Sequence, residues 1–224
     1  MNFKVLSMKA ENPHLDTLQD IRSMMEKSSR FISLSGLSGI GAGMAALGGA
    51  FFTYRMMVAE KAKGTDYRHL AFETGSAIQQ HLLLIGGLTF LAAVLLAFLF
   101  TYLRSIKTGV PMYGASAKRL LWNTMIPLLV GAIVVFRFIQ WGYGGLVAPT
   151  CLLFYGLALI NGSKYTLTEI RWLGYSELIL GIINLWLIGY GLLFWAFGFG
   201  ILHIVYGIAM WWRYERKINT DSHA

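Results

Sequence analysis

The chain has 224 residues, of which 56% are hydrophobic and 13% are charged, whereas about a quarter of the residues in a soluble domain are charged. The apolar residues form unbroken runs without the alternation of half-buried soluble elements, which excludes an ordinary water-soluble domain. The formal net charge is +8, but no nucleic-acid-binding motif accompanies it, and we expect no nucleic-acid partner. The single cysteine, Cys151, excludes an intramolecular disulfide and a cysteine-based metal site.

Six apolar runs are each close to the ~20 residues that a helix needs to cross ~30 Å of hydrocarbon. They lie approximately at 31–54, 81–103, 120–140, 145–162, 173–190 and 192–212. The last two are nearly continuous, and as one helix they would be about twice as long as the hydrocarbon is thick. The chain must therefore fold back, and Gly189-Tyr190-Gly191 is the natural turn. The sequence predicts an all-α, polytopic transmembrane bundle of about six helices, with residues 31–212 as one domain.

The basic residues are unevenly distributed between the two sides of this bundle. With a cytoplasmic N-terminus, fourteen of the 19 Lys and Arg residues fall on the inner side and five on or near the outer side. This asymmetry predicts that both termini are cytoplasmic. The cytoplasmic segments would be 1–30, 104–119, 163–171 and 213–224, and residues 56–80 would lie outside. The first thirty residues are polar and mixed in charge, so we expect no secretory signal peptide.

An amphipathic helix is expected in the cytoplasmic segment 1–30, ahead of the first run. Apolar residues recur there at mostly helical spacing, with charged residues between them; they are Leu15, Leu18, Ile21, Met25 and Phe31. Two interpretations of residues 15–31 stay open. The helix could lie on the membrane and anchor the first span, or it could be a docking surface for a cytoplasmic protein partner. Residues 213–224 would form a cytoplasmic tail.

Small residues recur four apart in the first run, at Ser35, Gly39 and Gly43. In lipid, small residues at this spacing let helix backbones approach closely, so we expect this face to pack against other helices. Gly181 in the fifth run and Gly200 in the sixth are expected to serve the same purpose. A ligand-lining face is the alternative, and a homo-oligomer is left open.

Three stretches resemble a known family of bacterial proteins. They are MEKSSRFISLSGLSGIGAG at 25–43, FYGLALINGSKYTLTEIR at 154–171 and GYGLLFWAFGFGILHIVYG at 189–207. The chain is similar to a group of small, six-helix bacterial inner-membrane proteins that carry no assigned activity. The resemblance implies a location in the bacterial inner (plasma) membrane. It provides no catalytic residue for this sequence.

The signatures of common enzymes are missing from the sequence. There is no phosphate-binding G-x-x-x-x-G-K-[ST], no zinc-binding H-E-x-x-H, no G-x-S-x-G elbow and no cluster of carboxylates with metal-ligand spacing. We therefore name no catalytic residue, no metal site and no cofactor, and an enzyme is the less favoured interpretation.

Placing an ionisable group inside the membrane costs free energy, so such a group by default suggests a functional site. In the fifth run, Glu177 and Asn184 share a face with two glycines, and in the sixth run His203 and Tyr206 share a face with Gly200. Glu177 and His203 are equally far from the predicted turn, so they should lie level and face each other. A polar clasp that locks the hairpin and a proton- or ligand-binding site are both consistent with this pattern.

Four basic residues near the inner ends of the second and third runs are candidates for binding anionic lipid headgroups. They are Arg104, Lys107, Lys118 and Arg119. For the whole protein we favour a non-enzymatic sensor or accessory bundle that binds a partner or a small or lipidic ligand. A small proton-coupled transporter or channel that uses Glu177 and His203 is the alternative. An intramembrane lipid-modifying enzyme ranks last, because only one carboxylate lies at membrane depth.

Overall fold

The computed structural model describes residues 34–64, 75–109 and 112–215, and this part of the chain contains helices and no strands. The helices are α2 (Gly36–Ala62), α4 (Ala77–Thr108), α5 (Ala115–Gln140), η1 (Gly144–Leu146), α6 (Val147–Gly162), η2 (Ser163–Tyr165), α7 (Thr168–Trp186), η3 (Ile188–Tyr190), α8 (Gly191–Trp195), η4 (Ala196–Leu202) and α9 (His203–Tyr214). The cytoplasmic segment predicted at 1–30, its amphipathic helix at 15–31 and most of the predicted tail lie outside the described residues.

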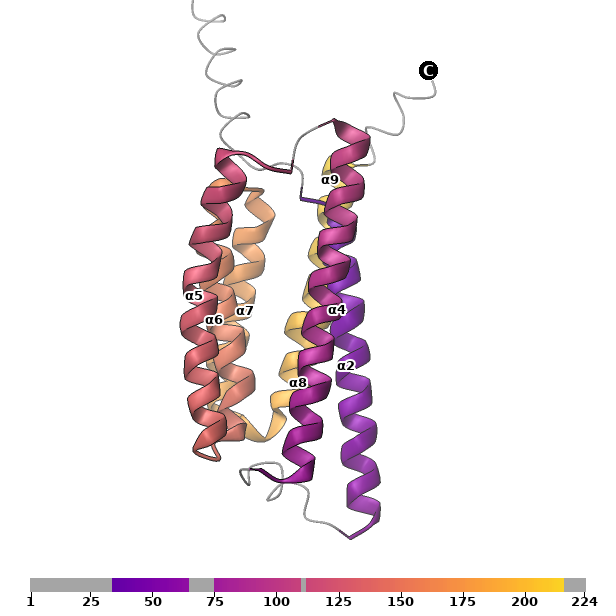
Figure 1. Ribbon diagram of the computed structural model, residues 1–224, viewed down its shortest axis with the longest axis vertical. Coiled ribbons are helices and arrows are strands. Elements are labelled where there is room, and N and C mark those ends of the chain that lie inside the picture. The colour runs from indigo at the N-terminus through magenta and orange to yellow at the C-terminus, as the bar shows by residue number, and fades with distance from the viewer. Residues whose placement is uncertain (1–33, 65–74, 110–111, 216–224) are drawn as a thin grey trace, which may run out of the picture.

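Six long helical rods cross the molecule side by side in alternating directions (Figure 1). Five of them are long and apolar enough to span a membrane: α2, α4, α5, the rod from Gly144 to Tyr165, and the rod from Ile188 to Tyr214. The sixth rod, α7, has 19 residues, including three charged side chains, Glu169, Arg171 and Glu177. The prediction of an all-α transmembrane bundle of about six helices is confirmed.

The chain folds back between α7 and the last rod at the predicted place. Helix α7 ends at Trp186, a short 3-10 turn follows at Ile188–Tyr190, and α8 begins at Gly191. A hydrogen bond from the hydroxyl of Ser35 to the carboxylate of Glu215 places the start of α2 and the end of α9 at the same end of the bundle. We call this the proximal end, and the end with the α7–α8 turn the distal end.

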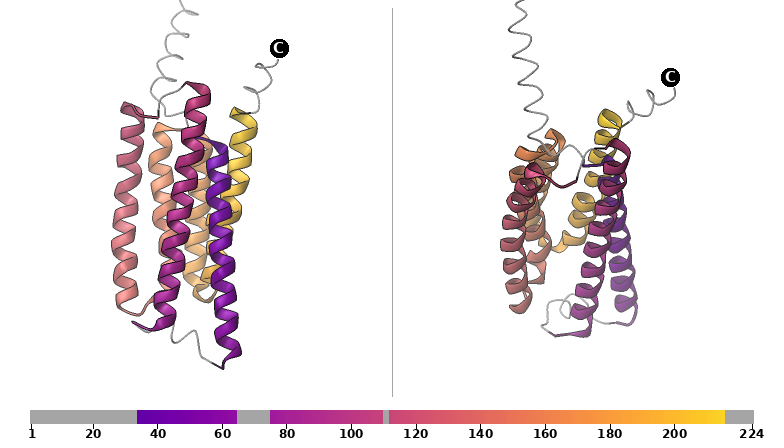
Figure 2. Two further views of the ribbon diagram at one scale, coloured as in Figure 1. Left: turned by 45° about the vertical axis from the view of Figure 1, so that its right-hand side comes forward. Right: turned by 45° about the horizontal axis from the view of Figure 1, so that its top comes forward.

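The six rods divide into two units of three (Figures 1 and 2). In the central unit, α6 packs against α5 on one side and α7 on the other. In the terminal unit, α2 packs against α4 and against the last rod, which consists of α8, η4 and α9. Contacts between the units are fewer, and they run mainly from α6 and α7 to the last rod. We call this junction the seam.

Glycines let the helices of each unit approach closely. A Cβ atom at Gly39 would lie 3.2 Å from the Cα atom of Gly207, and one at Gly43 would lie 2.7 Å from the carbonyl oxygen of Gly200. In the central unit, a Cβ at Gly181 would lie 2.9 Å from the side chain of Leu153. Side chains at these positions would force the helices apart. The close approach therefore depends on glycine, as is common for packed helices in membranes. Gly181 of α7 and Gly200 of the last rod therefore pack within different units, because Gly200 faces Leu47 of α2, although the sequence suggested that their two faces meet.

Ser35 differs from the other small residues, because it is the N-cap of α2 and not a packing residue within the helix. Its side-chain oxygen accepts a hydrogen bond from the backbone N–H of Leu37 at 3.2 Å. Glu215 covers the same helix end, accepting from the backbone N–H of Gly36 at 2.6 Å. Arg104 of α4 pairs with Glu215 at 3.2 Å and also donates to the carbonyl of Leu34. These contacts join the three rods of the terminal unit at the proximal end.

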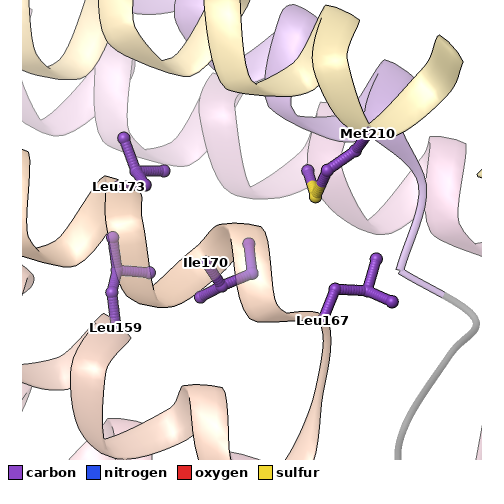
Figure 3. Packing of buried hydrophobic residues seen from close by; sticks show 5 residues of the cluster. All are labelled: Leu159, Leu167, Ile170, Leu173 and Met210. Atoms are coloured by element: carbon purple, nitrogen blue, oxygen red, sulfur yellow. The ribbon is translucent and has the colours of Figure 1, made fainter. Parts of the chain in front are cut away.

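An apolar cluster of buried side chains packs across the seam near the proximal end. Four of its members come from the central unit, and Met210 reaches toward them from α9 (Figure 3). The four are Leu159, Leu167, Ile170 and Leu173, and all five side chains are buried. Met210, with its unbranched and adaptable side chain, packs between α9 and the first turns of α7. The two units thus meet in a packed layer at this level.

Replacing Gly43 by alanine should destabilise the bundle, because the added methyl group would meet the backbone of Gly200 and Ile204. We expect a loss of about 1–3 kcal/mol in the free energy of unfolding, measured on purified protein in detergent. The matched control is Gly48→Ala in the same helix, where nothing lies within 4 Å of the added atom. This variant should be neutral or slightly stabilising. Equal stability of the two variants would contradict the close packing of α2 on the last rod.

Candidate functional site

Polar pairs cross the seam between α7 and the last rod from the proximal end to the middle of α7. At the proximal end, Glu169 pairs with Arg213 at 3.0 Å and accepts a hydrogen bond from the hydroxyl of Tyr214. The hydroxyls of Ser176 and Tyr206 lie 3.3 Å apart further along. The series leads to a pair that is more deeply buried than the others, Glu177 of α7 and His203 of α9.

The side chains of Glu177 and His203 face each other, as their equal distance from the turn predicted. Oε1 of Glu177 lies 3.5 Å from Nδ1 of His203, and the Glu177 side chain has no exposed surface. Neither carboxyl oxygen of Glu177 has a hydrogen-bond partner among the described residues. A buried polar group without partners is expensive. The carboxyl group is therefore held at this depth at a cost in stability.

The hydrogen bonds of His203 determine which of its nitrogens carries a proton. Nδ1 lies 3.0 Å from the carbonyl oxygen of Gly198, and because a carbonyl can only accept, Nδ1 must carry the hydrogen. Nε2 lies 2.6 Å from the hydroxyl of Tyr155. In the neutral imidazole Nε2 is then an acceptor, so Tyr155 donates to it. Both ring nitrogens are satisfied by these two bonds, which leaves Glu177 without a full hydrogen bond from the ring.

The backbone of the last rod changes geometry beside the carboxyl group. Residues Ala196–Leu202 form a π-helical segment that ends directly before His203. A Cβ atom at Gly198 would lie 2.6 Å from Oε2 of Glu177 and 2.6 Å from a methyl group of Leu152. Only glycine at this position lets the carboxyl group rest against the backbone of the rod. π-Helical turns within α-helices are frequent at functional sites.

The other two residues predicted for this site lie elsewhere. Asn184 is fully buried, but it is two turns from Glu177, about 10 Å along the helix axis. Its amide group donates to the carbonyl of Leu187 at 3.0 Å, so it caps the distal end of α7. Tyr206 bonds to Ser176 and not to Glu177. The structure thus brings together Glu177 and His203 from the predicted set, while Asn184 and Tyr206 take part in separate contacts.

Tyr155 of α6 completes the cluster, although the sequence pattern did not indicate it. Its ring stacks on His203, with the centroids 5.3 Å apart, and lies tilted against Phe199, with the centroids 5.1 Å apart. A signal was present, because a tyrosine in the middle of an apolar span needs a partner for its hydroxyl group. Which helix supplies that partner depends on how the helices pack, and the sequence does not contain that information. We call Glu177, His203 and Tyr155 the seam cluster.

The four predicted headgroup residues all lie near the proximal end, but in different environments. Arg104 is largely covered and paired with Glu215, whereas Lys107, Lys118 and Arg119 are exposed. Arg104 therefore has a structural role in addition to any contact with lipid.

The seam cluster is suited to holding and exchanging a proton. It contains a carboxyl, an imidazole and a phenol in van der Waals contact or hydrogen bonded, with two of the three groups on the central unit and one on the terminal unit. The described residues contain no group of three or more His, Cys, Asp or Glu side chains that could hold a metal ion. The available chemistry in this cluster is proton transfer and hydrogen bonding.

Replacing Tyr155 by phenylalanine should weaken the seam, because Nε2 of His203 would lose its buried partner. We expect a loss of about 1–3 kcal/mol in the free energy of unfolding. Tyr175→Phe is the matched control, because Tyr175 lies on α7 and is 42% exposed. Thermal unfolding of both variants in the same detergent makes the comparison. An unchanged stability of Tyr155→Phe would show that the hydrogen bond contributes nothing to the seam.

The chain matches no protein-family model, no curated protein and no solved structure. The chemistry of the seam cluster is therefore the basis for a functional proposal.

Proposed function

We propose that this protein is a non-enzymatic membrane sensor in which protonation of the seam cluster controls how the two helical units fit together. One observation carries the proposal: the carboxyl group of Glu177 is completely buried at the seam, and both of its oxygens lack a hydrogen-bond partner among the described residues. Ionisable residues inside membrane spans are rare and mark functional sites by default.

A purely structural clasp would be built differently. Polar side chains that only hold helices together satisfy each other, as Glu169 does with Arg213 and Tyr214 at the proximal end of the same seam. Glu177 lies 3.5 Å from a ring whose two nitrogens already have other partners. Because an unsatisfied carboxyl group destabilises the closed seam, its presence is better explained by a change of state than by stability.

Protonation would act on the contact between the units. With one proton shared by Glu177 and His203, the pair is neutral overall, either as acid and imidazole or as carboxylate and imidazolium. Loss of that proton leaves a net negative charge in an apolar seam, which is costly unless water reaches it. A rise in pH should therefore open the seam. The Phe199 ring lies against Tyr155, His203 and Trp195, with centroids 5.1, 6.0 and 4.9 Å away, so a movement of His203 is passed to the α8 end of the rod.

Location and orientation form part of the proposal. We place the protein in the bacterial inner membrane, with both termini in the cytoplasm. The resemblance described above supports the location, and the basic residues support the orientation. The ends of α2 and α9 joined at Ser35 and Glu215 lie at one end of the bundle, together with the exposed basic residues Lys107, Lys118 and Arg119.

The sensor is tested by replacing Glu177 with glutamine, which keeps the shape of the side chain and removes its proton equilibrium. Spin labels at Lys107→Cys on α4 and Lys118→Cys on α5 report the distance between the units, in a background with Cys151 replaced by alanine. We expect the distance distribution of the parent protein to broaden or lengthen as pH rises and that of Glu177→Gln to stay constant.

Glu60→Gln is the control for this experiment, because Glu60 lies near the distal end of α2 and pairs with Lys63 at 2.7 Å, away from the seam. It should respond to pH like the parent protein. Loss of stability in both Glu177→Gln and His203→Ala, with no pH-dependent distance change in the parent, would establish a clasp in place of the sensor. Proton flux in proteoliposomes that depends on Glu177 would instead establish the transporter.

The orientation predicts which positions react with a membrane-impermeant thiol reagent in intact cells. In the Cys151→Ala background, a cysteine at Lys118 should be protected, and a cysteine at Lys63 should be labelled, because both side chains are exposed at opposite ends of the bundle. Labelling of the Lys118 position alone would invert the orientation.

A further inference from the structure

A groove opens at the proximal end of the terminal unit, where α2 begins and where α4 and α9 end. Its volume is about 420 Å³, and its walls include Leu37 of α2, Phe100 and Leu103 of α4 and Trp211 of α9. The volume lies within the range of sites that hold one small molecule or part of a larger one. The apolar walls require an apolar occupant.

The rim of the groove is cationic. Arg104 and Lys107 line it, and Glu215 is the one acidic side chain among the residues that the structure assigns to its lining. Arg104 uses Nη1 for both of its contacts with described residues, Leu34 and Glu215, so its guanidinium keeps further donors. Lys107 is exposed and forms no ion pair within the described ranges. The two cations and one carboxylate leave a net positive charge for an anionic group.

The apolar and charged parts follow each other along α4. Phe100, Arg104 and Lys107 are lining residues spaced four and three positions apart, so they lie on one face of the helix over about 10 Å. The apolar residue is nearer the middle of the bundle and the lysine is nearer its end. This order matches an amphiphile that lies parallel to the helix, with its charged head at the membrane surface.

We propose that the groove binds an anionic phospholipid from the surrounding bilayer. Its phosphate group lies between Lys107 and the free donors of Arg104, and an acyl chain lies against Leu37, Phe100, Leu103 and Trp211. Bilayer lipid is favoured over a soluble anion because the groove is on the lipid-facing side of α4, where Leu103 is 46% and Ile106 is 62% exposed. The bound lipid joins α2, α4 and α9 next to the Arg104–Glu215 contact. This inference is independent of the proposed proton sensor.

The headgroup contact is tested by native mass spectrometry of the full chain, with phosphatidylglycerol and phosphatidylcholine as probes. The parent protein should bind phosphatidylglycerol in preference to phosphatidylcholine. Lys107→Gln should lower the affinity for phosphatidylglycerol about five-fold, the effect of one lysine near a charged surface. Lys118→Gln is the matched control, because Lys118 is an exposed lysine near the same end but outside the groove, and its affinity should be unchanged.

The acyl-chain contact is tested by filling the groove. Leu103→Trp should reduce the number of bound lipids by one, whereas Leu99→Trp should not, because Leu99 is equally exposed on α4 but does not line the groove. Inorganic phosphate at millimolar concentration should not displace the lipid, since it offers no apolar part.

Three results would overturn the proposal. Equal effects of Lys107→Gln and Lys118→Gln would show a general attraction of the surface for anionic lipid. Lipid binding that is unchanged by Leu103→Trp would show that the groove is not the binding place. Displacement by inorganic phosphate would identify a site for a soluble anion.

Discussion

Helices in a bilayer gain little by burying apolar side chains against one another, because lipid tails are as apolar as leucine. Helix association must therefore rely on close van der Waals packing or on polar groups. This protein uses both means. Gly43 in the terminal unit and Gly181 in the central unit let neighbouring helices of the same unit pack closely, and hydrogen bonds, an ion pair and the layer around Met210 join the units across the seam. The strength of the seam therefore depends on the state of its polar groups.

The helical architecture followed from the sequence because the bilayer dictates the length of an apolar run. The equal depth of Glu177 and His203 could also be predicted from the sequence, because a turn near Gly189 determines which residues of α7 and the last rod are opposite. The identity of neighbouring helices did not follow. The glycines of α7 and of the last rod suggested one shared face, but Gly181 faces Leu153 of α6, and Gly200 faces Leu47 of α2. A small residue allows close approach without specifying the helix that approaches.

The composition of the seam cluster also depends on which helices are neighbours, and the sequence does not specify this. Helical periodicity placed Asn184 on the face of Glu177, and the structure keeps it on that buried face. Periodicity gives no information about depth within a packed bundle, however. Asn184 donates its side-chain N–H to the carbonyl of Leu187 at the helix end, and its Oδ1 has no hydrogen-bond partner among the described residues. Tyr155 enters the cluster from α6, a helix that the pairing of α7 with the last rod does not involve. Residues from a third helix are the part of a membrane site that a single sequence specifies least.

The contact between Glu215 and the first turn of α2 has a consequence for the order in which the helices assemble during synthesis. The central unit is contiguous in the chain, so its three helices can associate as soon as α7 has entered the membrane. The terminal unit combines the first rod of the described chain with the last, and the N–H of Gly36 obtains its carboxylate partner from a residue 179 positions later. Because domains assemble as their segments emerge during synthesis, α2 and α4 must wait as an incomplete pair. Synthesis of α9 then completes the terminal unit, and only at that stage can His203 reach Glu177.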